Sequence, residues 1–200
     1  DSSGVYAWYY SNKISSHDIG LLIKKLETSG DLFSKQEMVK QFLLKHVFSF
    51  YEEMSYEARI SGKLKASYTG QLTHEQIISE KLIDRIVEKP QVLNYIKSTL
   101  LDIDESFMSP LYIGMANNLS KRLIKHKRLI EEYRERGASN GGDYYHEDDR
   151  DHNFATRIIQ KSFIETNLYV VITKVSDENS MHNIMENILN RINYPILGRN

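Results

Sequence analysis

The sequence contains no cysteine and only three prolines among its 200 residues. Without cysteine, the chain can form neither a disulfide bond nor a thiolate metal site, which is typical of cytoplasmic proteins. No stretch approaches the roughly 18–20 consecutive apolar residues of a membrane-spanning helix, and none resembles a signal peptide. We therefore expect a cytoplasmic protein with no membrane partner, whose 40% hydrophobic residues can fill a core.

A large excess of charge of either sign is also missing, since 26 Lys and Arg residues are balanced by 27 Asp and Glu residues. A chain with this balance is not expected to coat nucleic acid along its whole surface. The segment 121–128 is a local exception, because five of its residues are Lys or Arg. Such a local positive face is sufficient to bind a phosphate group, although a solvated charged helix gives the same pattern.

The segment 111–126, with the sequence LYIGMANNLSKRLIKH, is the part of the chain on which the functional prediction depends. It begins as a short apolar strand, turns at Gly114, and continues as a helix from Leu119 that the preceding asparagine pair can cap. The apolar stripe of that helix consists of Leu119, Leu123, Ile130 and Tyr133. His126 lies inside the stripe and Arg122 at its edge. Because a guanidinium beside an apolar face is unfavourable without an anionic partner, we expect a binding site here.

The aromatic segment 5–10 predicts an early strand, yet the next strand, at 111–113, follows only after about a hundred residues. The intervening chain shows helical periodicity in four segments. These are residues 18–27, 35–54, 74–88 and 91–100. We therefore predict that residues 13–109 form a helical subdomain inserted between the first two strands of a sheet.

The C-terminal part of the chain predicts three further elements: a helix at about 152–164, a strand at 168–173 and a last helix from Asn179 or Ser180. The nearly continuous apolar run of the strand is typical of the buried centre of a sheet. The apolar stripe of the last helix consists of Met181, Ile184, Met185, Ile188, Leu189 and Ile192. Glu186 lies on the flank of that stripe, where a carboxylate can face a cleft.

The segment 59–70 differs from the helical sequence around it, because basic and apolar residues alternate there among glycines. One interpretation is an extended arm or hairpin tip that binds nucleic acid. Arg59, Lys63 and Lys65 would then reach phosphates and Tyr68 would stack on a base. The other interpretation is a surface connector.

Five features of the chain occur in a characteristic order. They are Gly4-Val5-Tyr6, Tyr112-Ile113-Gly114, the pair Arg122 and His126 at a spacing of four, Glu186, and Pro195 nine residues later. This order resembles the GIY-YIG nuclease family, over residues 1–12 and 110–200. The resemblance implies an α+β nuclease core, with a small, mainly antiparallel three-stranded sheet flanked by helices.

The resemblance further implies a Mg²⁺-dependent endonuclease, with Mn²⁺ as a substitute, that hydrolyses phosphodiester bonds in DNA. Glu186 would hold the metal, which suits Mg²⁺ because this ion keeps much of its hydration shell. Arg122 would bind a phosphate oxygen, and His126 would shuttle a proton or contact the phosphate. Tyr6 or Tyr112 would accept the proton of the attacking water, and the sequence leaves open which one.

Each of these residues also has a structural interpretation when it is taken singly. The tyrosines can be ordinary strand aromatics, His126 a core histidine and Glu186 a solvated carboxylate, and only their joint order favours the site. The cationic helix adds Lys121 and Lys125 as candidate DNA contacts.

The chain also departs from the family pattern at two positions. Met115 stands where many members have lysine, and Gly198 where asparagine is usual, so that Asn200 is the candidate for the asparagine's role. These departures motivate an alternative, a catalytically weakened module that binds nucleic acid or serves in assembly on a nuclease fold. RNA as the substrate, and a homo-oligomer or a larger complex, are also compatible with the sequence.

Overall fold

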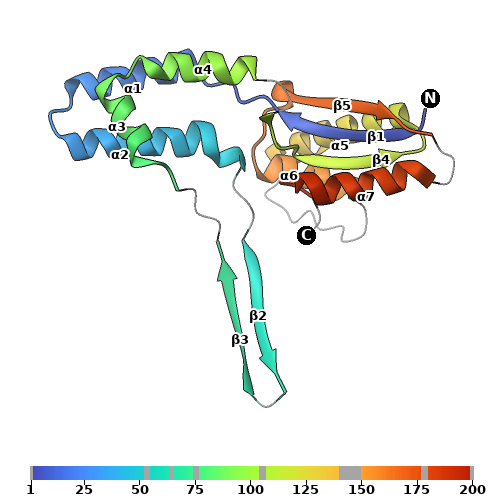
Figure 1. Cartoon of the computed structure of the whole chain (residues 1–200). Helices are drawn as coiled ribbons and strands as arrows, with labels where there is room; N and C mark the ends of the chain where they lie inside the picture. Colours follow the sequence, from blue (N-terminus) through green and yellow to red (C-terminus); the bar gives the residue numbers. More distant parts are fainter. Residues whose placement is uncertain are drawn as a thin grey trace. The chain divides into compact units, whose positions relative to one another are not determined.

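The computed structural model describes residues 2–51, 55–63, 65–73, 77–103, 107–139, 150–176 and 180–198. Helices and small antiparallel sheets make up the structure, which confirms the expected α+β class (Figure 1). The chain divides into two compact units, the first formed by Asp1–Asn12 with Leu100–Asn200 and the second by Lys13–Thr99. The division falls inside helix α4 (Val92–Asp102), whereas the sequence analysis places it after residue 109.

The first unit is built on a three-stranded antiparallel sheet with the strand order β4 (Tyr112–Ala116), β1 (Gly4–Tyr10), β5 (Leu168–Lys174). Tyr6 on β1 lies opposite Gly114 on one side and Ile172 on the other. The central strand is therefore β1, whose alternating aromatic side chains are buried. The prediction that 168–173 forms the centre of the sheet is wrong, because β5 is an edge strand on which Ile172 is 49% exposed.

Three helices flank this sheet: α5 (Leu119–Ser139), α6 (Arg150–Gln160) and α7 (Met181–Asn193). Helix α5 begins where the sequence predicts it, and the side-chain oxygen of Asn118 accepts a hydrogen bond of 3.0 Å from the backbone N–H of Lys121. Helices α5 and α6 pack against each other, and α5 contacts β1 and β4, while α7 runs along β4 (Figure 1). Helix α6 ends earlier than predicted, before Ser162 adopts a positive φ of 55°.

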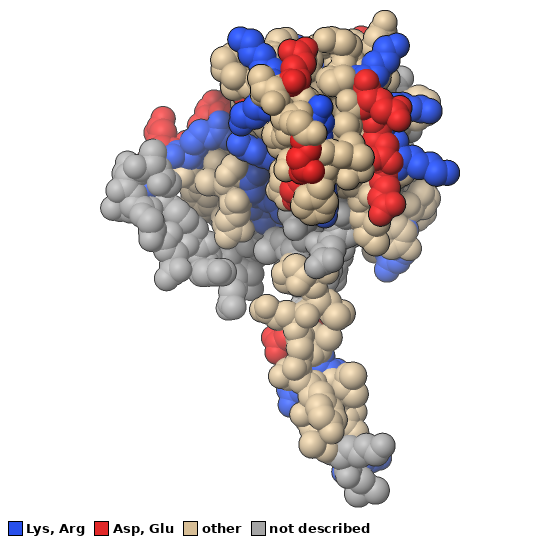
Figure 2. Space-filling model, turned by 90° about the vertical axis from the view of Figure 1, so that its left-hand side faces the viewer, with Lys and Arg blue, Asp and Glu red and all other residues tan. Residues whose placement is uncertain are grey.

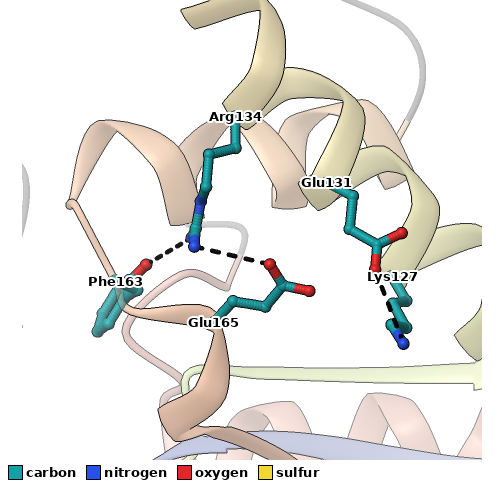
Figure 3. Close-up of polar contacts among 5 residues, drawn as sticks. All are labelled: Lys127, Glu131, Arg134, Phe163 and Glu165. Carbon is teal, nitrogen blue, oxygen red and sulfur yellow. Dashed lines mark hydrogen bonds and ion pairs between the residues drawn. The ribbon is translucent and has the colours of Figure 1, made fainter. Parts of the chain in front are cut away.

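Helix α5 is tied to the turn between α6 and β5 by Arg134 (Figure 3). One guanidinium nitrogen donates a hydrogen bond of 2.8 Å to the carbonyl oxygen of Phe163, and the other lies 3.6 Å from the carboxylate of Glu165. The ion pair is partly exposed and adds little by itself. The hydrogen bond gives the backbone carbonyl of the buried residue Phe163 a partner. Arg134 thereby fixes the orientation of the helix that carries Arg122 and His126.

The last helix presents a different face to the sheet than its apolar stripe suggests. Ile184, Ile188 and Ile192 are between 44% and 67% exposed, whereas His182 is 2% exposed. Glu186 is half-buried. The periodicity of the stripe therefore predicts the helix correctly but not the direction in which it faces.

The second unit contains the helices α1 (Ser16–Thr28), α2 (Leu32–Leu43), α3 (Glu80–Glu88) and most of α4. The predicted helix 35–54 is regular only as far as Leu43, and a π-helical turn and a 3₁₀ turn follow it up to Tyr51. The predicted helix 74–88 begins at Glu80. Residues 52–54 and 74–76 lie outside the described residues. Among the helices that the structure describes, none is long and apolar enough to cross a membrane.

The second unit also contains a two-stranded antiparallel ribbon, β2 (Tyr56–Gly62) with β3 (Lys65–Leu72) (Figure 1). Ile60 pairs with Tyr68, and the register shifts between Ile60 and Gly62. The segment 59–70 therefore forms a hairpin, as one of the two interpretations expected, and whether it binds nucleic acid or only connects the helices stays a prediction.

Candidate active site

The hydroxyl group of Tyr6 lies between two polar side chains of helix α5. The Nε–H of Arg122 donates a hydrogen bond of 3.2 Å to the Tyr6 oxygen, and Nε2 of His126 lies 3.4 Å from the same oxygen. Tyr6 is 2% exposed and His126 is fully buried, whereas Arg122 is half-buried. Because the guanidinium can only donate, the Tyr6 oxygen accepts from Arg122 and its own proton can point to His126.

Glycine is required at position 114 for this arrangement. A Cβ atom on Gly114 would lie 2.5 Å from the Tyr6 hydroxyl oxygen and 2.8 Å from a ring carbon of Tyr112. The phenol of Tyr6 therefore occupies the space above its cross-strand partner. Gly4 is restricted by the backbone itself, since a Cβ there would lie 2.3 Å from the carbonyl oxygen of Thr173. At both positions, one in each sequence triplet, a side chain would clash with neighbouring atoms, which explains why the residue is glycine.

An aromatic frame surrounds the imidazole of His126. Trp8 stacks on it with a centroid distance of 6.2 Å and an interplanar angle of 9°, and Phe154 of helix α6 lies 5.0 Å away. The ring of Tyr112 is 4.9 Å from that of Phe154 and 6.2 Å from that of Tyr6. Phe154 comes from a segment without a motif, and its place in the frame was not anticipated from the sequence.

Tyr112 also borders a cleft of about 210 Å³ between β4, α6 and α7. The residues that line it are Tyr112, Ile113, Phe154, Arg157, Glu186, Asn187, Asn190, Arg191, Leu197 and Gly198. Arg122 and His126 are not among them, so in the described part of the chain Tyr112 connects the hydrogen-bonded group of Tyr6 to the cleft of Glu186. The structure therefore brings the five predicted catalytic residues to one region, at the β4 edge of the sheet.

Two guanidinium groups and one carboxylate line the cleft. Arg157 donates hydrogen bonds of 2.8 Å and 3.0 Å to the carbonyl oxygens of Leu197 and Gly198, which fix its position. Arg191 lies on the same helix as Glu186 and bonds to Asn187. An excess of cationic groups beside a single carboxylate suits an anionic ligand such as a phosphate group. The signal for Arg157 was present in the sequence, because it follows Phe154 by three residues on an apolar helix face, as Arg122 borders the stripe of α5.

The C-terminal segment forms one wall of the cleft. The backbone N–H of Leu197 donates a hydrogen bond of 2.7 Å to the carbonyl of Leu111, just before β4, and that of Gly198 donates one of 2.8 Å to the carbonyl of Pro195. A Cβ on Gly198 would lie 2.7 Å from the Pro195 ring. The turn therefore explains glycine at this position. Asn200 lies outside the described residues.

Among the residues that line the cleft, Glu186 carries the carboxylate that could hold a hard divalent cation. The amide oxygen of Asn187 already accepts a hydrogen bond from Arg191. No group of three or more His, Asp or Glu residues that could enclose a metal occurs among the residues that the structure describes. A single carboxylate in an open cleft is compatible with Mg²⁺, which retains several water ligands and binds through one or two carboxylates together with substrate phosphates.

The predicted DNA contacts lie on two different elements. Lys121 is exposed and Lys125 half-buried on α5, whereas Arg59, Lys63 and Tyr68 are exposed on the ribbon of the second unit. Lys65 belongs to β3, but its side chain lies outside the described residues.

Comparisons with family models, with curated proteins and with solved structures find no match to this chain.

Proposed function

We propose that this protein is a Mg²⁺-dependent endonuclease that hydrolyses phosphodiester bonds in DNA. It would belong to the GIY-YIG type, with the nuclease core at 1–12 and 110–200 and a helical insertion at 13–109. The observation that carries the proposal is the Tyr6 hydroxyl held between Arg122 and His126, with Tyr112 linking them to the cleft of Glu186.

Hydrolysis of a phosphodiester needs an attacking water, a partner for the phosphate charge and a proton acceptor. The Tyr6 oxygen accepts a hydrogen bond from Arg122, and the imidazole of His126 lies on its other side. If His126 takes the phenolic proton, the resulting phenolate is stabilised by the guanidinium and can accept a proton from water. This relay requires the His126 tautomer with the proton on Nδ1.

Tyr112 is the alternative proton acceptor, because it is half-buried and lines the cleft directly. In that case Tyr6 would polarise the phosphate together with Arg122. Comparing Tyr6→Phe with Tyr112→Phe distinguishes the two roles, since the variant that lacks the proton acceptor should lose the dependence of the rate on pH in the range where the phenol ionises.

Mg²⁺ bound at Glu186 would supply Lewis-acid stabilisation of the charge that develops on the phosphate. The chain itself contributes the binding of the substrate. Arg157 is held rigid by two carbonyl groups, and Arg191 lies beside it in the cleft. Both could pair with non-bridging phosphate oxygens, and the scissile bond would then lie between them and the tyrosines.

Nicking of supercoiled plasmid in Mg²⁺ or Mn²⁺ tests the proposal. Glu186→Gln and Arg122→Ala should abolish nicking, whereas Glu131→Gln and Arg128→Ala remove the same charges from exposed positions on α5 and should not. Nicking at the same rate by all five proteins, the unmodified chain included, would show that a contaminant or another site is responsible. A parallel assay on RNA of the same sequence decides between the two nucleic acids.

The second candidate is a module that binds nucleic acid or serves in assembly without cleaving it. Gly198 favours this alternative, because the turn with Pro195 leaves no side chain at the position where the family usually places asparagine. Such a module would bind duplex DNA tightly and in a salt-dependent way, with no turnover on addition of Mg²⁺. Turnover that is lost in Glu186→Gln would exclude it.

A further inference from the structure

The ribbon of β2 and β3 has two chemically different faces. Cross-strand partners point to the same side of an antiparallel pair, and successive residues alternate. The apolar face therefore consists of Ala58 with Gly70, Ile60 with Tyr68, and Leu72, whereas Glu57 with Gln71 and Arg59 with Thr69 form the opposite, polar face. Within the described part of the chain, the two strands pair only with each other.

The large side chains of the apolar face are exposed. Ile60 is 72% exposed, Tyr68 65% and Leu72 62%. An isolated two-stranded ribbon is at best marginally stable in water, because it cannot bury an apolar face against a further layer. Large apolar side chains that gather on one side of such a ribbon indicate a surface that another molecule covers.

The apolar face is not flat. The small pair Ala58 and Gly70 lies between the large pair Ile60 and Tyr68 on one side and Leu72 on the other. A Cβ atom on Gly70 would meet nothing within 4 Å, so the packing of this chain does not explain the glycine. It also lies away from the register shift at Ile60 and Gly62. Glycine inside a regular strand weakens the strand and often marks a close approach of a ligand or of another backbone.

The charge around this face identifies the class of ligand. The residues 56–72 carry three cations, Arg59, Lys63 and Lys65, and one carboxylate, Glu57, whereas the whole chain has a net charge of −1. In Figure 2 the ribbon shows mostly uncharged surface, with positive charge toward its tip. Arg59 lies on the polar face and Lys63 in the turn at the end of the ribbon, so the positive charge belongs to the ribbon as a whole. A ribbon with an excess of cations and one apolar face is complementary to a nucleic acid, whose phosphates pair with the cations and whose bases contact the apolar side chains.

We propose that the apolar face of the ribbon inserts into a groove of duplex DNA. Ile60 and Tyr68 act as an apolar wedge against the bases, and the notch at Ala58 and Gly70 admits the sugar-phosphate backbone. Proteins that insert apolar side chains between base steps unstack and bend the duplex. The inference rests on the proposed function for the identity of the ligand as DNA, but it concerns binding and makes no use of the cleft.

The test uses the full chain with Glu186→Gln, in buffer without divalent metal, and a duplex that contains 2-aminopurine. Ile60→Ser combined with Tyr68→Ser should weaken binding by roughly tenfold or more, given the size of base–aromatic stacking, and should abolish the rise in 2-aminopurine fluorescence that unstacking produces. The matched control, Thr69→Ser combined with Gln71→Ser, alters the polar face of the same ribbon and should change binding less than about twofold. Equal effects of the two pairs would overturn the inference.

A second measurement does not depend on loss of binding. The chain has one tryptophan, Trp8, which is buried, so a tryptophan on the ribbon is a distinct fluorescent reporter. Tyr68→Trp should be strongly quenched by the duplex, and Thr69→Trp on the opposite face should not. If the double serine variant instead changes the sedimentation of the free protein and leaves DNA binding intact, the face joins two copies of the chain and the inference is wrong.

The two proposals fail in different ways. Duplex binding that depends on the apolar face, without nicking in Mg²⁺ by the unmodified chain, would retain the ribbon inference and overturn the nuclease. Nicking by the double serine variant with unchanged affinity and unchanged DNA bending would retain the nuclease and overturn the ribbon inference.

Discussion

Gly114 and Gly70 are both strand glycines in antiparallel sheets, yet their surroundings differ completely. The space above Gly114 is filled by the phenol of Tyr6, whose oxygen would lie 2.5 Å from an added Cβ, whereas the space above Gly70 is empty. The first glycine is therefore explained by the chain's own packing. The second has no explanation in the chain's own packing, which agrees with our proposal that it leaves room for a ligand.

The tyrosines beside these glycines differ in the same way. Tyr6 is 2% exposed and hydrogen-bonded to Arg122, while Tyr68 is 65% exposed. A buried hydroxyl that is fixed by charged and titratable partners is suited to chemistry at one point in space. An exposed ring on a ribbon is suited to contact with a surface. This difference agrees with our two proposals, in which the first unit carries the catalytic site and the ribbon contacts the ligand.

The first prediction concerns Gly114, the buried glycine of the first unit. Gly114→Ala forces the Tyr6 ring out of its position, and overpacking of this kind costs about 1–3 kcal/mol and occasionally more. Urea unfolding followed by the fluorescence of Trp8 measures it, because this single tryptophan lies on the same strand as Tyr6. Gly70→Ala is the matched control and should leave the Trp8 transition unchanged. An unaltered midpoint for Gly114→Ala would mean that Tyr6 does not occupy this space in solution.

The next effect concerns the hydroxyl rather than the ring. Tyr6→Phe should lower the nicking rate by about 100-fold or more, the range for a lost proton transfer, with little change in DNA affinity. Tyr10→Phe is the control, because Tyr10 is equally buried on the same strand and its hydroxyl lies 3.5 Å from Asn167 rather than near Arg122. A loss of activity of similar size in both variants would indicate that the strand is sensitive to any lost hydroxyl and that Tyr6 has no special role.

The sequence predicts elements better than it predicts their surroundings. The start of α5 at Leu119 was readable because an asparagine cap and an apolar stripe are local signals. The sequence did not predict that β5 lies at the sheet edge or that Ile188 on α7 is exposed. An apolar pattern shows which side chains favour burial. Whether they are buried in the fold also depends on which other helix or strand packs against them.

The candidate site shows the same limit. Tyr6, Arg122 and His126 were selected from their order in the chain, and the structure places them in contact through hydrogen bonds. Their catalytic roles remain predictions. Phe154 comes from a helix without any motif. Although the place of Arg157 beside an apolar face is a sequence signal, only the three-dimensional packing reveals that Phe154 supports the imidazole and that Arg157 lines the cleft.

Gly70, the exposed glycine of the ribbon, can be tested in the same way, and the expected change in stability is smaller. Gly70→Ala should stabilise the ribbon by roughly 0.4–1 kcal/mol, because the unfolded chain loses freedom and no contact opposes the methyl group. If the notch admits a DNA backbone, the same variant should nevertheless bind the duplex several-fold more weakly. Hydrogen exchange of the ribbon amides measures the first quantity and fluorescence anisotropy the second. Tighter binding together with slower exchange would show that the notch has no ligand.

The last prediction concerns the stability of the two units at low pH. The helices of the second unit should lose stability in acid through His46, and the sheet of the first unit should not. Partial burial lowers the pKa of His46 from its ordinary value of 6.5, and this outweighs the attraction of Asp18. The unfolded state therefore binds more protons than the folded state as the pH falls through 6.5, so the stability that His46 contributes is present above that pH and is lost below it.

Thermal unfolding between pH 5.5 and 7.5 should accordingly show a helix transition, followed by circular dichroism, that weakens toward acid. His46→Gln should flatten this dependence, because the glutamine does not titrate. His17→Gln, at an exposed position of α1, is the control and should leave the slope as it is. The Trp8 signal of the sheet should not respond to either substitution, since neither histidine belongs to the first unit. An identical slope with and without His46 would mean that other groups account for the acid sensitivity of these helices.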